Sequence, residues 1–173
     1  MKKRLTIIQM DVHVNDVEYN YTRVQELLSQ SLSEHPDIIV LPETWNTGFY
    51  PSKELINIAD RNGERTQSLL STFAKKHNVN IVGGSVAVAK NDVVFNTSYT
   101  YNRNGELVGE YSKMHGFSPA KEDQYFAGGT HTTHFELDGI PCSTVICYDI
   151  RFPELVRMAA LPGTELLFVP AQW

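Results

Sequence analysis

The first ninety residues alternate short apolar runs with amphipathic stretches, a pattern typical of alternating strands and helices. Apolar runs at 5–12, 37–41 and 80–88 predict strands. The second run (DIIVL) is continuously apolar and β-branched, as in a parallel strand that is covered on both faces. Between these runs, residues 17–32 and 66–77 place their apolar side chains at helical spacing. The order predicts a β-α-β-α-β unit and thus an α/β fold.

A hairpin and a second group of strands are predicted next. Residues 94–101 and 106–111 flank an Asn-Gly pair that favours the tight turn of a β-hairpin, and a polar loop follows them from 112 to 131. The remaining strands are predicted at 133–137, 141–146 and 166–169, with a helix over 153–161 that begins at a proline, where a missing N–H loses no hydrogen bond.

Composition and charge narrow the class of protein. The chain has 173 residues, 42% of them hydrophobic and 20% charged, so we expect a single domain over residues 1–173. Its 15 basic and 20 acidic side chains leave a net charge of -5, which gives no electrostatic reason to bind nucleic acid or an anionic membrane. A small molecule is the expected partner.

No export signal or membrane span is predicted. The apolar stretch behind the basic residues 1–4 is short and soon meets Gln9 and Asp11, unlike a signal peptide. No run approaches the ~20 apolar residues that cross a bilayer, and we expect a cytoplasmic protein. Cys142 and Cys147 should point to opposite faces, so no disulfide is expected between them.

Reactive side chains follow three predicted strands, and the carboxyl ends of strands are where open α/β sheets bind ligands. Glu43 comes directly after the apolar run 37–41, a partly dehydrated place that suits proton transfer, although a surface glutamate fits the same position. Lys113 follows the hairpin. Taken by itself, Lys113 is most simply a solvated lysine.

Cys147 begins a sharp turn between a strand and the helix that starts at Pro153. The field of that helix and a cation such as Lys113 would activate its thiol as a thiolate. A buried structural cysteine is the alternative, and Cys142 fits that alternative. The six histidines show neither a Cys-His pattern nor metal-ligand spacing, so a carboxylate base and a lysine would have to assist the thiol, without a metal.

Three motifs carry a resemblance to a known family. The stretches LPETW (41–45), YSKMH (111–115) and VICYDIRFPEL (145–155) resemble, in that order, the Glu, Lys and Cys signatures of the nitrilase superfamily. The third is similar to the branch of small-amide hydrolases that includes ω-amidases. The resemblance covers essentially the whole chain, including the stretches at 83–85 and 95–97.

The resemblance implies an αββα four-layer sandwich and an amidohydrolase that needs no cofactor. Glu43 would be the general base, Lys113 the oxyanion stabiliser and Cys147 the nucleophile that forms a thioester with a small amide. An ω-amide of a dicarboxylate or oxo-acid, such as 2-oxoglutaramate, is the favoured substrate. Glu122 matches the family's second glutamate and would orient Lys113 or the substrate amide, although a solvated loop acid fits too.

Three further residues, Tyr148, Arg151 and Trp173, are candidates to border the substrate pocket. Gly116 departs from the family pattern, which usually has a bulky aliphatic residue there. Family members also continue beyond the position of Trp173, so we expect a sandwich that is incomplete at its C-terminus, and a homo-oligomer. The alternative functions are a truncated, non-catalytic interaction protein or, less favoured because no resolving cysteine is suitably placed, a thiol redox protein.

Overall fold

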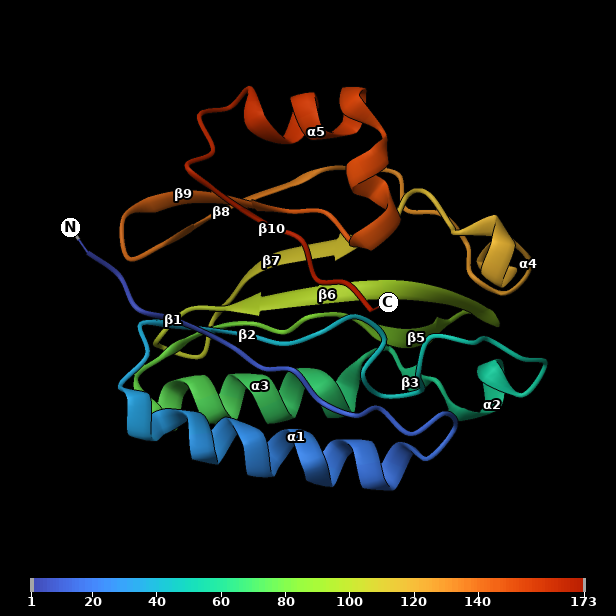
Figure 1. The fold of residues 1–173 in the computed structure, drawn as a ribbon, viewed down its shortest axis with the longest axis horizontal. Coiled ribbons are helices and arrows are strands. Elements are labelled where there is room, and N and C mark those ends of the chain that lie inside the picture. The colour runs from blue at the N-terminus through green and yellow to red at the C-terminus, as the bar shows by residue number, and fades with distance from the viewer. Residues whose placement is uncertain (1, 173) are drawn as a thin grey trace.

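Two β-sheets lie face to face between layers of helices in the computed structural model, which describes residues 2–172 (Figure 1). The larger sheet has seven strands and the smaller has three. The larger sheet runs, in spatial order, β1 (Leu5–Ile7), β2 (Ile38–Val40), β4 (Asn80–Val82), β6 (Val93–Tyr101), β5 (Val86–Lys90) and β3 (Asp60–Arg61), with β7 (Leu107–Ser112) also paired to β6. The smaller sheet runs β10 (Leu166–Phe168), β9 (Ile140–Thr144) and β8 (Thr133–Leu137).

Helices cover the outer face of each sheet. The helices α1 (Val17–Ser31) and α3 (Glu64–His77) lie beneath the larger sheet, and α5 (Pro153–Ala160) lies above the smaller one (Figure 1). This is the αββα order that the resemblance implied, and that prediction is confirmed. The remaining short elements are η1 (Leu32–Glu34), α2 (Leu55–Ile58), η2 (Ser118–Ala120), α4 (Glu122–Tyr125) and η3 (Cys147–Arg151).

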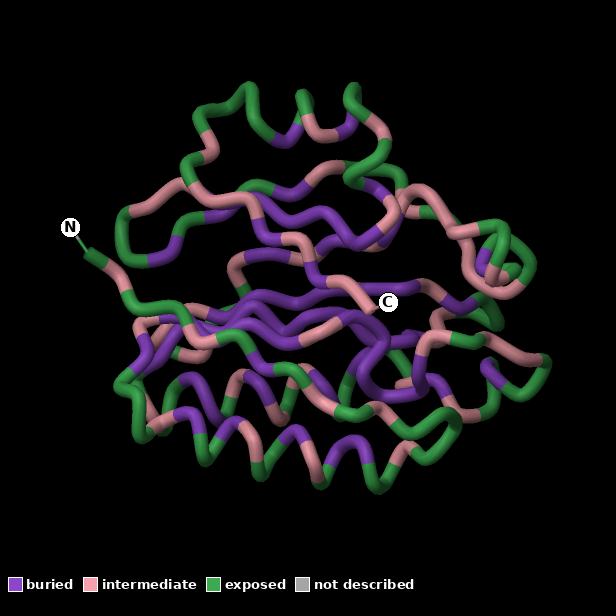
Figure 2. Tube along the Cα trace, viewed as in Figure 1, coloured by how far each residue is buried: buried purple, intermediate pink, exposed green. Residues whose placement is uncertain are grey.

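Buried apolar side chains fill the three gaps between the four layers, so burial follows the sheets in Figure 2. Leu28 and Leu70 join the helices α1 and α3 to the larger sheet, where they contribute to the same cluster as Ile81. Between the sheets, the core contains Ile38, Val40, Val82, Phe135, Leu137, Cys142 and Phe168. Three continuous cores of this kind fix the stacking of the layers, because apolar burial is the main favourable contribution to folding.

The prediction of one continuous strand over 80–88 is wrong, because the structure has two strands there, β4 and β5. The break lies at Gly83-Gly84-Ser85, and Gly84 has a left-handed φ of +62°. A Cβ on Gly84 would lie 2.0 Å from the carbonyl oxygen of Pro42, so only glycine lets the two chain segments come this close. The bend brings Ser85 against the turn that carries Glu43.

The described residues, 2–172, include no helix that is long and apolar enough to cross a membrane.

An ion-pair cluster joins strand ends of the two sheets. Arg103, in the turn between β6 and β7, donates hydrogen bonds to Asp37 (2.8 Å) and Asp138 (2.7 Å), and Lys3 donates to Asp138 (2.8 Å). The hydrogen bond from Arg103, together with that from Lys3, outweighs partial burial and holds the pKa of Asp138 well below its usual value. Asp138 therefore stabilises the fold in its ionised form.

We predict that Asp138→Asn lowers the Tm near pH 7 and that this deficit becomes smaller as the pH falls from about 5 to about 2. The contribution of a carboxyl group with a lowered folded-state pKa is complete above its unfolded pKa of about 3.9 and is lost as the pH falls through the folded-state value. Thermal unfolding across this pH range tests it, with Asp11→Asn, whose side chain is 93% exposed, as the matched control. A deficit that is constant with pH would contradict the prediction.

Candidate active site

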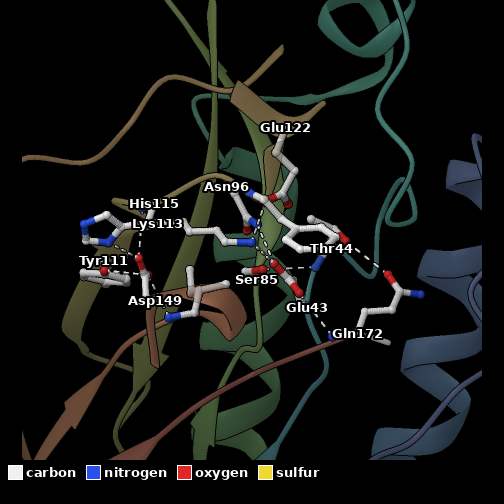
Figure 3. Close-up of polar contacts among 12 residues, drawn as sticks. Glu43, Thr44, Ser85, Asn96, Tyr111, Lys113, His115, Glu122, Asp149 and Gln172 are labelled. Atoms are coloured by element: carbon white, nitrogen blue, oxygen red, sulfur yellow. Dashed lines mark hydrogen bonds and ion pairs between the residues drawn. The ribbon is translucent and has the colours of Figure 1, made fainter. Parts of the chain in front are cut away.

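Lys113 lies between two buried carboxylates (Figure 3). Its Nζ atom is 2.8 Å from Oε1 of Glu43 and 2.7 Å from Oε2 of Glu122. Lys113 is 4% exposed, Glu43 0% and Glu122 1%. Buried charges are tolerated when they are paired and hydrogen-bonded, so each of these three groups stabilises the ionised form of its neighbour. We call Glu43, Lys113 and Glu122 the charged cluster.

The carboxylate of Glu43 is fixed by two further donors. Asn96 Nδ2 donates to Oε1 (3.0 Å), and the backbone N–H of Gln172 donates to Oε2 (3.1 Å). The next residue, Thr44, has a left-handed φ of +43°, which is a strained conformation for a β-branched residue. Its N–H donates to Ser85 Oγ (3.0 Å), so the bend between β4 and β5 supports the turn after β2. The surface glutamate considered from the sequence does not occur here.

Lys113 comes directly after β7 and is kept charged by its neighbours. Burial alone would lower the pKa of Lys113, but the negative charges of Glu43 and Glu122 outweigh it and raise that pKa. The interpretation of Lys113 as a solvated lysine is wrong, because its side chain is only 3% exposed. An ammonium group held in this way can stabilise a negative charge that develops beside it.

Glu122 is the first residue of α4, a short helix inside the segment expected to be a polar loop. Its Oε2 atom accepts hydrogen bonds from Lys113 and from the N–H of Phe117 (2.6 Å). Burial raises the pKa of Glu122, and the charge of Lys113 offsets part of this effect. Glu122 is thus a buried partner of Lys113 and not the solvated acid that also fitted the sequence.

Cys147 begins η3, three residues after the end of β9, with a left-handed φ of +46°. Such a conformation costs a non-glycine residue about 1–3 kcal/mol and persists only where its surroundings hold it. The N–H of Cys147 donates to the carbonyl oxygen of Pro170 (2.9 Å), and its side chain packs in a cluster with Tyr111 and Ile146. Both cysteines are free, and Cys142 lies in the core between the sheets.

The thiol of Cys147 is protonated in the resting site. Burial, followed by the negative charge of Glu43 and a hydrogen bond to it, raises the pKa of Cys147 to about 12, and the opposing effect of Lys113 is smaller. Our expectation of a resting thiolate is therefore wrong, because burial and the charge of Glu43 outweigh the effect of the Lys113 cation. The carboxylate of Glu43 faces this thiol and is placed to accept its proton.

The structure brings Glu43, Lys113, Glu122 and Cys147 together but places the other candidates differently. Tyr148 is half-buried and packs edge-on against Phe117, with ring centroids 5.1 Å apart. Arg151 is exposed. Trp173 lies outside the described residues.

Asn96, Asp149 and Gln172 contact this region and were not identified from the sequence. Asn96 had a usable signal, because it begins the run Asn96-Thr97-Ser98 of polar residues inside a predicted strand, and buried polar residues are usually hydrogen-bonded to something specific. Asp149 lay inside the cysteine motif, where its neighbours in sequence say nothing of its partners. Gln172 contributes its backbone, which leaves no signal in the sequence.

A cavity of about 180 Å³ adjoins the charged cluster and is lined by Asn96, Lys113, Met114, Gly116, Glu122, Asp123, Phe126, Ala127 and Gly128. This is smaller than the roughly 300–1,000 Å³ of pockets for drug-sized ligands. Within residues 2–172, no group of three or more His, Cys, Asp or Glu side chains is arranged to hold a metal ion.

Comparisons with known proteins agree with this architecture. The chain matches the carbon-nitrogen hydrolase family over residues 4–173. It is 41% identical over 173 residues to a 2-oxoglutaramate amidase of Bacillus subtilis. The aligned region covers 100% of this chain and 66% of that protein. It is 33% identical over 181 residues to an omega-amidase of Danio rerio. The aligned region covers 98% of this chain and 63% of that protein. The chain thus spans about two thirds of the length of these relatives.

The same fold occurs in a solved structure. An amidase from Nesterenkonia sp. superposes with a TM-score of 0.86 at 23% identity, over 98% of this chain and 64% of that chain.

We predict that Lys113→Met lowers the free energy of unfolding by about 3–5 kcal/mol near pH 8, because it leaves two carboxylates buried together without their cation. The loss should be smaller near about pH 5.5. Without the lysine, a buried carboxyl keeps its proton to a higher pH than in the unfolded chain, so its unfavourable effect grows as the pH rises through that raised pKa. Denaturant unfolding at both pH values gives the comparison.

Lys90→Met is the matched control, since Lys90 pairs with Glu110 at 2.8 Å with both side chains more than a third exposed. It should lose less than about 1 kcal/mol at either pH. Equal losses in the two variants, or a Lys113→Met loss independent of pH, would show that the charged cluster is not a closely coupled set of ions.

Proposed function

The chain belongs to the carbon-nitrogen hydrolase family, and on that basis we propose that its site cleaves the C–N bond of a small carboxamide to give a carboxylate and ammonia. The observation that carries the proposal is the position of the Cys147 thiol beside the buried carboxylate of Glu43, which itself accepts a hydrogen bond from Lys113 (2.8 Å). This arrangement supplies a nucleophile, a base and a cation for the developing oxyanion within one buried group.

Acylation begins when Glu43 takes the thiol proton as the sulfur of Cys147 attacks the amide carbon. The carbonyl oxygen becomes an oxyanion, which Lys113 and the backbone N–H of Tyr148 stabilise. Collapse of this tetrahedral intermediate breaks the C–N bond. Glu43 returns its proton to the leaving nitrogen, so ammonia departs and a thioester remains on Cys147.

Deacylation uses the same groups in the same order. Glu43 takes a proton from water, the resulting hydroxide attacks the thioester, and Lys113 again stabilises the oxyanion. The C–S bond breaks, and the thiolate of Cys147 recovers its proton from Glu43. One amide and one water are consumed, and one carboxylic acid and one ammonia are formed. Glu122 contributes by holding Lys113 in place.

The favoured substrate is an ω-amide of a small dicarboxylate or oxo-acid, such as 2-oxoglutaramate. The names of two relatives, a 2-oxoglutaramate amidase and an omega-amidase, support this class. The cytoplasmic location, the homo-oligomer and contacts of Arg151 with substrate stay predictions.

We predict that the complete natural protein releases ammonia from ω-amides of oxo-acids and dicarboxylates at least about tenfold faster than from aromatic amides or nitriles of similar size, a margin of about 1.4 kcal/mol. Ammonia release from such a panel tests this substrate class. Cys147→Ser should abolish the release, because a carboxylate base that suffices for a thiol does not ionise a serine hydroxyl.

Cys142→Ser is the matched control and should keep its turnover, since Cys142 lies in the core between the sheets. If Cys147→Ser retains the rate of the parent, Cys147 is not the nucleophile.

We also predict that Glu43→Gln lowers kcat at least about 100-fold, because both half-reactions lose their proton acceptor. Glutamine keeps the size of the side chain and can still accept from Lys113. Intact mass after mixing with substrate follows the acyl adduct on Cys147. The adduct should form at least about 100-fold more slowly than in the parent, and adduct formation at the parent's rate would remove Glu43 from the first step.

A further inference from the structure

Asp149 is fully buried two residues after Cys147 and accepts hydrogen bonds from three different residues. Its Oδ2 atom accepts from the hydroxyl of Tyr111 (2.7 Å) and the N–H of Ile146 (3.1 Å). Its Oδ1 atom accepts from the N–H of His115 (2.9 Å) and lies 2.9 Å from His115 Nδ1. Both oxygens are therefore fully used, and all of their partners come from the segments that carry Lys113 and Cys147.

The partners of Asp149 bracket the reactive residues. Tyr111 and His115 stand two positions before and two positions after Lys113, and Ile146 directly precedes Cys147. Figure 3 shows Tyr111 and His115 turned toward Asp149, while the side chain of Lys113 points away from it toward Glu43. One carboxylate thus fixes the lysine segment against the cysteine turn without touching the charged cluster.

The turn at Cys147 needs such support. Its left-handed φ of +46° is unfavourable for a residue with a Cβ, and the turn is closed by two hydrogen bonds, Ile146 N–H to Asp149 Oδ2 and Asp149 N–H to Ile146 O (3.0 Å). The first of these depends on the side chain of Asp149. If it is lost, the backbone at Cys147 can relax, and the sulfur moves away from Glu43.

We infer that Asp149 is a positioning residue for the proposed reaction. It fixes the position of the Cys147 sulfur relative to the Lys113 ammonium, although Lys113 follows a strand of the larger sheet and Cys147 follows a strand of the smaller one. The inference rests on the proposed function. A carboxylate is required because every group facing its two oxygens is a donor, or can be one in the case of His115 Nδ1. An asparagine would turn its NH₂ group toward a backbone N–H, that of Ile146 or that of His115, whichever way its amide is oriented.

The test compares Asp149→Asn with Asp138→Asn in the complete natural protein. Both changes replace an aspartate that accepts several hydrogen bonds. Asp138, unlike Asp149, lies in the ion-pair cluster at the strand ends, where it pairs with Lys3 and Arg103. Asp149→Asn should lower kcat at least about tenfold with KM within about threefold, since misplacing a reacting group affects the chemical step more than binding. Asp138→Asn should lower the Tm but leave kcat within about twofold. Equal effects of the two variants on kcat at similar loss of Tm would overturn the inference.

A second measurement separates this inference from the proposed function. Iodoacetamide alkylates Cys147 without amide hydrolysis, and intact mass follows the rate. Because the thiol relies on Glu43 to lose its proton, Asp149→Asn should slow alkylation at least about tenfold relative to Asp138→Asn. If the parent releases no ammonia from any amide, the proposed function fails while this comparison still stands. An unchanged or faster alkylation overturns the role of Asp149.

Tyr111→Phe is a second variant that tests the same contact if Asp149→Asn does not fold. It keeps the buried ring and removes a single donor to Asp149, so kcat should fall about fivefold, the size expected for one net hydrogen bond. Tyr101→Phe is the matched control, because the hydroxyl of Tyr101 makes a long hydrogen bond (3.4 Å) to Gln67, which is not among the residues of the site. If the two variants have the same kcat, the contact between Tyr111 and Asp149 has no positioning effect.

Discussion

The ammonium group of Lys113 is the feature on which the separate segments of the site depend. A lysine that is only 4% exposed needs negative partners, and Glu43 and Glu122 supply them from the end of β2 and from α4. Those carboxylates would in turn repel each other without the lysine. The turn after β2, the end of β7 and the short helix α4 are therefore fixed against one another by three charges, none of which is stable alone in a buried position.

This charged cluster is surrounded by backbone that is itself strained. Thr44 and Cys147 both have left-handed φ values, +43° and +46°, and each lies at or next to a proposed reactive residue. Strain of this kind persists only where the surroundings over-determine it. At Thr44 the support is the hydrogen bond to Ser85, which the glycine at 84 allows to form by its close approach to Pro42. At Cys147 the corresponding support comes from Pro170, whose carbonyl oxygen accepts from the Cys147 N–H, and from Asp149, whose side chain closes the turn.

Much of this arrangement could be predicted from the sequence, for an identifiable reason. The apolar runs by themselves predict the strands that Glu43 and Cys147 follow, whereas the roles of these residues come from the three motifs that resemble the nitrilase superfamily. What could not be predicted depends on contacts between distant segments. The break between β4 and β5 lies where Gly84 comes close to Pro42, and α4 begins at Glu122, which accepts a hydrogen bond from the distant Lys113. The thiolate expected at Cys147 failed for the same reason, because burial outweighs the nearby cation.

The charge balance of the site explains why a protonated thiol suits the proposed reaction. In the resting site, the single ammonium group of Lys113 faces the two carboxyl groups of Glu43 and Glu122. A thiolate at Cys147 would add a negative charge to this buried group, which burial opposes. Transfer of the thiol proton to Glu43 instead moves one negative charge from oxygen to sulfur and leaves the total unchanged. Attack on the amide then moves that charge to the carbonyl oxygen, where Lys113, released from part of its interaction with the now neutral Glu43, can stabilise it. The same carboxylate that keeps the thiol protonated at rest is thus the group whose protonation frees the lysine for the oxyanion.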